Sequence, residues 1–487
     1  MQQITLDYKT WRAGISTADG IEDGGYSPLY GGHNLQEFTG DILYPQDLYS
    51  LRESGSDFLP TGEPVLYVKS PEAGSSSNSI FGVLIDDENN PYGHTSPNVM
   101  EDEGTINSSN IEFRNYGEED GISFQSDIYI AGDENVALIN IDGLGGYSSH
   151  DSNWWTSARG HASLGSDKKV LVVVEDTLYI CTENEIHIWD GSSSQENALT
   201  LPPDFMVTAG LKHPNGRDLI LFGAVRDNAG ESAASKFRVY YINTIDLEFT
   251  DELEMTQEVQ GCWYIGGTIY VTSGEWLGIF NGRDVEKLYH LNIDLPDSAS
   301  SNVREGLIFT IHGTITHQGH LLVPDGNKVL AVGNVGGGTI MWHPFDAGDD
   351  MDIVHMVFNI GNKDVGIYGY QGERWDGTLV GVQLDLDDTG GSCKWASNKI
   401  RFDQHAWVRR IEIEHETLES GDDFSVGHIQ QDGTEVTLRQ VTHTKYGAVG
   451  KTRIDCNVYT DVFQYLHTWT SGAVGVRKIT IWYEGGE

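Results

Sequence analysis

The chain has 487 residues, which is enough for more than one domain, and it contains 58 glycines and 10% aromatic residues. Asp and Glu number 73 against 30 Lys and Arg, a formal net charge of −43. This balance disfavours a nucleic-acid partner, because neutralising phosphates requires clusters of Lys and Arg. Apolar residues with a 3.6-residue period are almost absent, so we expect an all-β chain of short strands and tight turns.

The acidic excess has two interpretations. A compact chain of this charge repels itself in dilute buffer, but salt screens the repulsion, with a Debye length of about 3 Å at 1 M. The protein is therefore adapted to high salt, or its acidic exterior only aids solubility. Acidic residues occur along the whole chain and not in one tail, which favours salt adaptation.

The first residues, MQQITLDYKTW, have neither a basic start nor an apolar segment, so they do not form a signal peptide. No run is long enough to span a bilayer. We therefore expect a protein made in the cytoplasm, without a membrane span. The four cysteines lack the spacing of a zinc site, and Cys181 is expected to be a small buried hydrophobe.

Residues 1–60 form an irregular lead-in rich in Gly, Asp, Tyr and Pro. It includes Trp11–Ser16, with the sequence WRAGIS, and Gly40–Pro45. The turns in this segment predict an N-terminal arm with little secondary structure, which its apolar and aromatic residues could anchor on a larger body.

Residues 61–390 carry a repeated hairpin. Thr177–Gly191 alternates apolar and polar residues on both sides of a polar turn, and Thr268–Gly282 is a near copy. Related strand centres recur every 42 to 52 residues, at Ile80, Tyr129, Tyr179, Leu221, Tyr270, Leu322 and Tyr368. This period is typical of β-propeller blades. We predict about seven blades, with six or eight as alternatives; a β-helix or stacked sandwiches would be the other architectures.

Residues 391–487 lose the blade period after a plausible linker at Asp385–Gly391. Seven candidate strands follow in about 90 residues, and Ile411 and Ile413 alternate with Glu412 and Glu414. The dense strands predict a C-terminal β-sandwich.

The densest group of candidate ligand-binding residues lies between Tyr147 and His161. His150, Trp154, Trp155 and Arg159 combine aromatic faces with polar donors, which could stack on and hydrogen-bond to a sugar ring. The alternative is a long loop between blades whose tryptophans pack on the propeller. Ser149-His150-Asp151 is not read as a catalytic triad, because triad members are normally apart in sequence.

Acidic clusters, including Asp86-Asp87-Glu88, could supply oxygen ligands to Ca²⁺, although solvated loops are the alternative. Two of them are the main candidates. They consist of Asp346, Asp349, Asp350 and Asp352, and of Asp385, Asp387 and Asp388. No other cofactor is expected. A glycosidase would need two carboxylates across a cleft, and the sequence selects no such pair, so no catalytic residue is assigned.

The layout resembles that of structural proteins of tailed viruses of bacteria and archaea. The matching pieces are Trp11–Ser16, the aromatic-Asp/Asn-Gly turns at Trp189–Gly191, Phe280–Gly282 and Trp375–Gly377, and the C-terminal sandwich. The resemblance implies a non-enzymatic virion component of the tail, tail tip or baseplate, with capsid decoration as an alternative. It also implies other virion proteins as partners, a homo-oligomer or symmetric ring, and a host-surface glycan or glycoprotein as a target. The alternatives are a propeller glycosidase or lyase acting on host surface polysaccharide, and a secreted salt-adapted binding protein.

Overall fold

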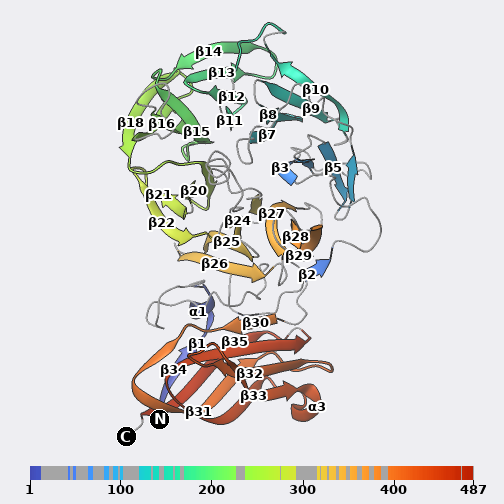
Figure 1. Cartoon of the computed structure of the whole chain (residues 1–487), viewed down its shortest axis with the longest axis vertical. Helices are drawn as coiled ribbons and strands as arrows, with labels where there is room; N and C mark the ends of the chain where they lie inside the picture. Colours follow the sequence, from blue (N-terminus) through green and yellow to red (C-terminus); the bar gives the residue numbers. More distant parts are fainter. Residues whose placement is uncertain are drawn as a thin grey trace.

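The structure is a computed structural model, and it has two parts, a ring of small sheets and a C-terminal sheet (Figure 1). Within the residues that it describes, no helix is long and apolar enough to cross a membrane. The described residues are 1–12, 42–43, 48–50, 64–69, 82–86, 91–96, 99–102, 120–132, 135–141, 147–156, 159–164, 169–225, 236–274, 276–291, 315–317, 320–325, 328–335, 339–346, 351–358, 365–371, 378–384, 393–472 and 474–485.

Within the described residues, seven four-stranded antiparallel sheets form the ring. The first three are blade 1 with β3 (Pro64–Lys69), β4 (Gly82–Asp86), β5 (Pro91–Ser96) and β6 (Val99–Asp102), blade 2 with β7 (Asp120–Phe124), β8 (Asp127–Ala131), β9 (Val136–Ile141) and β10 (Tyr147–Trp155), and blade 3 with β11 (Lys169–Val174), β12 (Thr177–Thr182), β13 (Glu185–Trp189) and β14 (Ser194–Thr200). The next two are blade 4 with β15 (Phe205–Lys212), β16 (Asp218–Val225), β17 (Lys236–Asn243) and β18 (Glu248–Met255), and blade 5 with β19 (Gly261–Ile265), β20 (Thr268–Ser273), β21 (Trp276–Phe280) and β22 (Val285–His290). The last two are blade 6 with β23 (Ile315–His317), β24 (His320–Asp325), β25 (Lys328–Val335) and β26 (Thr339–Asp346), and blade 7 with β27 (Met351–Phe358), β28 (Val365–Gln371), β29 (Thr378–Leu384) and β2 (Leu48–Ser50).

Neighbouring blades contact one another mainly through their inner strands, from β3 to β7 and onward to β27, which contacts β3 again. The predicted all-β class with a β-propeller is therefore confirmed. Six of the seven predicted strand centres lie in the second strand of a blade: Tyr129, Tyr179, Leu221, Tyr270, Leu322 and Tyr368. The centre at Ile80 lies outside the described residues. Cys181 of β12 is fully buried, as predicted.

The aromatic-Asp/Asn-Gly turns have a common geometry. Asp190 accepts hydrogen bonds from the backbone N–H groups of Ser192 and Ser193, at 2.8 and 2.7 Å. Hydrogen bonds from the Ser193 hydroxyl and from these amides lower the pKa of Asp190. Gly191 follows with φ of 93°, a conformation that glycine adopts without steric cost. In blade 5, Asn281 and the next residue repeat this geometry, so the turn residues serve the architecture.

The described strands of the N-terminal segment pair with later parts of the chain. Strand β1 (Gln2–Leu6) pairs with the last strand of the C-terminal sheet, and β2 completes blade 7 by pairing with β29. Little secondary structure in residues 1–60 stays a prediction, because most of this segment lies outside the described residues. The last blade is completed by a segment from near the start of the chain, which ties the two ends of the propeller together.

Opening this closure should destabilise the ring. Replacing both Tyr49 and Ser50 with proline removes two successive N–H groups of β2. Successive N–H groups point to opposite edges of a strand, so one of the two faces β29 and at least one hydrogen bond between the strands is lost. We expect a loss of about 1–3 kcal/mol in the free energy of unfolding, measured by thermal and urea denaturation. Alanine at both positions keeps the amides and is the matched control. Equal stability of the two variants would show that β2 does not close the ring.

The C-terminal unit is one seven-stranded sheet in the order β1-β35-β31-β34-β32-β33, with β30 pairing β34. Its elements are β30 (Cys393–Ala396), β31 (Ile400–His415), β32 (Asp423–Ile429), β33 (Glu435–Thr442), the short helix α3 (His443–Tyr446), β34 (Lys451–Ser471) and β35 (Val476–Gly485). Another short helix, α1 (Tyr8–Arg12), follows β1 and contacts β26 of the propeller.

Two long strands replace four of the seven strands predicted for this unit, namely Lys399–Phe402 and Trp407–His415 by β31, and Thr452–Val458 and Phe463–Thr470 by β34. The first half of β34 pairs with β31, and its second half pairs with β32, so that the sheet continues from one half to the other. The prediction of seven separate sandwich strands is therefore wrong in detail, because β31 and β34 each span two of them. Both halves bury side chains in one cluster that includes Ile411, Ile413, Phe424, Trp469 and Ile481.

Candidate functional site

The two predicted ligand-stacking tryptophans are buried between blades 2 and 3. Trp155 is fully buried and Trp154 is 9% exposed. The ring centroid of Trp154 lies 4.8 Å from that of Tyr129 and 5.2 Å from that of Trp189, both edge-on. Trp155 stacks on His161 at 4.3 Å. These faces are covered by protein, so the stacking interpretation is corrected in favour of packing between blades.

The other two predicted residues do not complete a site around these tryptophans. His150 lies in β10 and pairs with Ile139, and its side chain lies outside the described part. The Arg159 side chain is 52% exposed and forms an ion pair with Asp151 at 2.5 Å. The structure therefore does not assemble the predicted sugar site from the residues that it describes.

The predicted Ca²⁺ ligands are only partly within the described residues. Asp346 ends β26, and Asp352 lies in β27 paired with Tyr370, but their side chains are outside the described part. Asp349, Asp350, Asp385, Asp387 and Asp388 lie outside it entirely. Among the described residues no group of three or more His, Cys, Asp or Glu side chains could hold a metal ion. Ca²⁺ binding stays a prediction.

An exposed row of aromatic side chains lies on the C-terminal unit. In β31, Ala406 and Val408 are buried, so the residues that alternate with them point away from the core. Trp407 pairs directly with Tyr459 of β34, and the two rings lie 4.8 Å apart. The ring centroid of His405 lies 5.2 Å from that of Tyr459. We call His405, Trp407 and Tyr459 the aromatic row.

Arg409 extends this row and is held in a fixed position. Its guanidinium carbon lies 4.7 Å from the ring centroid of Trp407, within the range of a cation–π contact. Its Nε donates to Glu484 at 3.1 Å, and its Nη1 donates to the Asn457 carbonyl oxygen at 2.7 Å. Side chains of three strands, β31, β34 and β35, therefore contact one another at the Arg409 guanidinium. These contacts order the exposed side chains before any partner binds.

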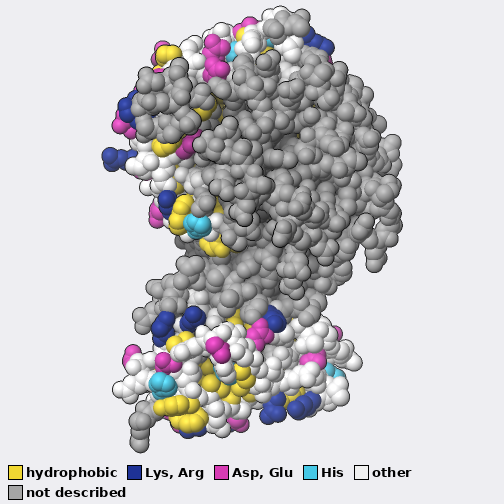
Figure 2. Space-filling model, in the orientation of Figure 1, with side chains coloured by type: hydrophobic (Ala, Val, Ile, Leu, Met, Phe, Trp, Pro, Cys, Tyr) yellow, Lys and Arg dark blue, Asp and Glu magenta, His cyan; other side chains and the backbone are white. Residues whose placement is uncertain are grey.

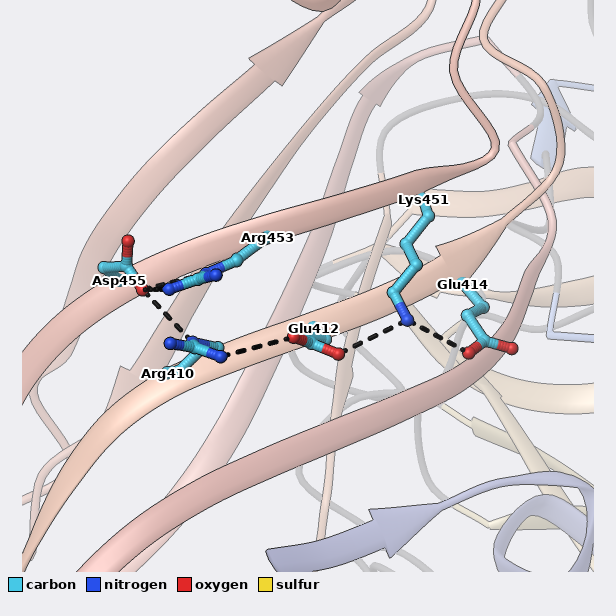
Figure 3. Close-up of polar contacts among 6 residues, drawn as sticks. All are labelled: Arg410, Glu412, Glu414, Lys451, Arg453 and Asp455. Atoms are coloured by element: carbon cyan, nitrogen blue, oxygen red, sulfur yellow. Dashed lines mark hydrogen bonds and ion pairs between the residues drawn. The ribbon is translucent and has the colours of Figure 1, made fainter. Parts of the chain in front are cut away.

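A ladder of charged side chains continues the same surface along β31 and β34. Its members are Arg410, Glu412, Glu414, Lys451, Arg453 and Asp455 (Figure 3). The Lys451 ammonium lies 3.3 Å from Glu412 and 3.4 Å from Glu414, and its hydrogen bond to Glu412 raises the pKa of Lys451. Asp455 lies 3.0 Å from Arg453 and 3.2 Å from Arg410, and the Arg453 hydrogen bond lowers the pKa of Asp455. We call the aromatic row, Arg409, Asn457, Glu484 and this ladder the outer face.

The charge of the chain is distributed unevenly between its two parts. Residues 393–487 contain 13 of the 73 acidic and 11 of the 30 basic residues, a net charge of −2, which leaves −41 of the total −43 for residues 1–392. Figure 2 shows basic, acidic and hydrophobic side chains intermixed on the C-terminal unit. The acidic excess thus belongs to the propeller part, and the outer face lies on a nearly neutral unit.

No motif in the sequence directly indicates the outer face. Trp407 and Tyr459 are distant in the sequence, and their pairing depends on a strand register that shifts between Arg401 and Ala406 and again between Val408 and Arg410. The alternation of Ile411 and Ile413 with glutamates predicted an exposed side of this strand, which was the one available clue.

Comparisons with known proteins give similarity in fold alone. No model of a known protein family matches the chain, and no curated protein matches it. The Dos1 propeller is similar with a TM-score of 0.41 and 11% identity, over 69% of this chain and 95% of that one. The Pan2 WD40 domain of Neurospora crassa has a TM-score of 0.40 and 5% identity, over 67% and 90%. A glycoside hydrolase family 43 arabinoxylan arabinofuranohydrolase from Bacillus subtilis has a TM-score of 0.29 and 10% identity, over 89% and 99%.

Proposed function

We propose that the protein is a non-enzymatic structural component of a tailed virus particle, placed in the tail, tail tip or baseplate. The observation that carries this proposal is the outer face of the C-terminal unit. Trp, Tyr and Arg are the residues in which the binding energy of protein interfaces is concentrated, and here they stand together and partly exposed. We propose that this face makes contacts within the particle.

The propeller is then a rigid disc joined to that contact unit. Ring closure by β2 and the pairing of β1 with β35 tie both parts to the N-terminal segment, which supports such an arrangement. Its acidic surface suits an outward position in a salt-rich medium, where screening removes repulsion between neighbouring discs. A host-surface glycan or glycoprotein is the proposed target of the outward side, and other virion proteins are the proposed partners of the contact unit.

The proposal predicts that incorporation into particles depends on the outer face. Particles made with the double variant Trp407→Ala, Tyr459→Ala should contain about tenfold less of the protein, as expected when interface anchors are lost. Quantitative mass spectrometry of purified particles measures this. Tyr264→Ala removes an aromatic side chain of similar exposure, 46% against 50% for Tyr459, from the propeller, and is the matched control.

Two outcomes would contradict the proposal. One is that purified particles of the virus encoding this chain contain none of it. The other is that the pure protein releases saccharide from host envelope polysaccharide, which would identify the alternative propeller glycosidase or lyase. A location on the capsid shell instead of the tail would support the capsid decoration alternative.

A further inference from the structure

We infer that the outer face is a self-association surface, on which a second copy of this chain docks to form a two-fold dimer. This inference rests on the proposed function in one respect, since it takes the same face as a contact surface, and it adds the identity of the partner.

The exposure of the aromatic row is the first argument. Tyr459 is 50% exposed, His405 is exposed, and Trp407 is half-buried. Arg409 is already fixed by Glu484 and Asn457, so ordering it at an interface costs little conformational entropy. A preorganised group of aromatic and guanidinium side chains has the composition of an interface centre.

Charge selects the kind of partner. A basic protein would be attracted to the propeller part, with its net charge of −41, more strongly than to a unit of −2. An acidic partner meets least repulsion at the C-terminal unit, and a second copy is such a partner. Within the outer face the charges cancel in local pairs, Arg409 with Glu484 and Lys451 with Glu412 and Glu414. Two identical faces can therefore approach without a net like-charge penalty.

The aromatic row lies near the C-terminal end of β35. Trp407 pairs with Glu484, and Ala406 pairs with Gly485, the last described residue. Figure 1 marks the C-terminus at the end of the C-terminal unit that lies away from the ring. A contact centred at this end lies on the part of the C-terminal unit that is farther from the acidic ring.

In a two-fold dimer the same patch of each copy forms its half of the interface, so the outer face of one copy contacts the outer face of the other. With the axis through the aromatic row, the rings of the two copies lie at the centre of the interface. The charged ladder then lies toward the rim, where exposed ion pairs contribute little affinity and mainly fix orientation.

The test is the mass of the pure full-length protein, measured by light scattering and sedimentation in about 0.1 M and about 1 M salt, where the Debye length is about 10 Å and about 3 Å. We expect a dimer in both. The double variant Trp407→Ala, Tyr459→Ala should weaken dimerisation by about 30-fold or more, the loss that interface hot spots typically cause. Tyr264→Ala should leave the dimer intact, and an unchanged β-sheet circular dichroism spectrum should show that each variant is folded.

Three results would overturn the inference. They are a monomeric wild type in both salts, a dimer that persists in the double variant, and a dimer that forms only in high salt, since the last would indicate association through screened propellers. A monomeric protein whose incorporation into particles still needs the outer face would contradict this inference alone. A dimer that is absent from particles would contradict only the proposed function.

Discussion

Replacing Trp155 with alanine should lower the free energy of unfolding by about 3–5 kcal/mol, the usual cost of removing a fully buried large aromatic side chain. Trp155 has no exposed surface, stacks on His161 at 4.3 Å and meets the ring of His187 edge-on at 5.7 Å. Its indole fills the space between blades 2 and 3 in the same cluster as Leu164, Leu171 and Ile180. The loss is measured by urea denaturation followed by circular dichroism.

Trp407→Ala is the matched control for this measurement. It deletes the same side chain from a half-exposed position on the outer face, so we expect a loss of less than about 1.5 kcal/mol. A Trp155→Ala protein of unchanged stability that no longer binds host glycan would contradict the packing assignment and support the stacking interpretation.

The propeller could be predicted because its signal is local and repeated. The second strand of most blades contains buried apolar residues around a tyrosine or leucine, as in Ile128, Tyr129 and Ile130 of β8, and a turn follows each strand. The second strand of a blade is paired along both edges and, in β8, β12 and β16, is buried on both faces, so its composition is constrained. These constraints are visible without knowledge of distant contacts.

Of the two interpretations of the adjacent tryptophans, packing on the propeller is confirmed, but Trp154 and Trp155 lie at the end of strand β10 and not in a loop. Neighbouring residues of a regular strand point to opposite faces, so a regular strand would not bring both rings into one cluster. The register of β10 against β9 shifts between Asp151 and Trp155, and both rings are buried. Such irregularities depend on the neighbouring blade, which is not encoded in the local pattern.

The N-terminal strands and the outer face depend on long-range pairing. β2 has only three residues and pairs with β29 near the end of the propeller, and β1 pairs with the last strand of the chain. A strand of three residues has too few positions for an alternating pattern to be recognised, and β1 lies at the opposite end of the sequence from its partner. The contact of Trp407 with Tyr459 likewise follows from register and not from spacing in the sequence.

Acidification should destabilise the C-terminal unit through its buried histidine His467. The ring is fully buried, stacks on Phe424 at 4.8 Å and contacts Trp469 at 4.3 Å. Its Nδ1 lies 2.9 Å from the Tyr465 hydroxyl oxygen. Burial, with a smaller effect from the neighbouring His415, lowers the pKa of His467 to about 3 from its ordinary value of 6.5.

The sign of the pH effect follows from this lowered pKa. The folded protein holds His467 neutral while the unfolded chain takes up a proton below pH 6.5, so the stabilisation is complete above 6.5 and is lost as the pH falls toward 3. The loss is about 1.4 kcal/mol per pH unit in this window, up to about 5 kcal/mol. Burial also lowers the pKa of His415 and of His428, which adds to the effect in the same direction.

The measurement is the free energy of unfolding between about pH 7.5 and about pH 4 at constant ionic strength, followed by tryptophan fluorescence, because Trp395 and Trp469 are buried in this unit. His467→Gln retains a hydrogen-bonding group for Tyr465 but cannot titrate, so its stability should fall less steeply with pH by about 1 kcal/mol per unit. His443→Gln, in the helix α3 that has no buried residue, is the matched control and should keep the slope of the wild type. Parallel pH profiles of the wild type and His467→Gln would show that a proton on His467 is tolerated in the folded core.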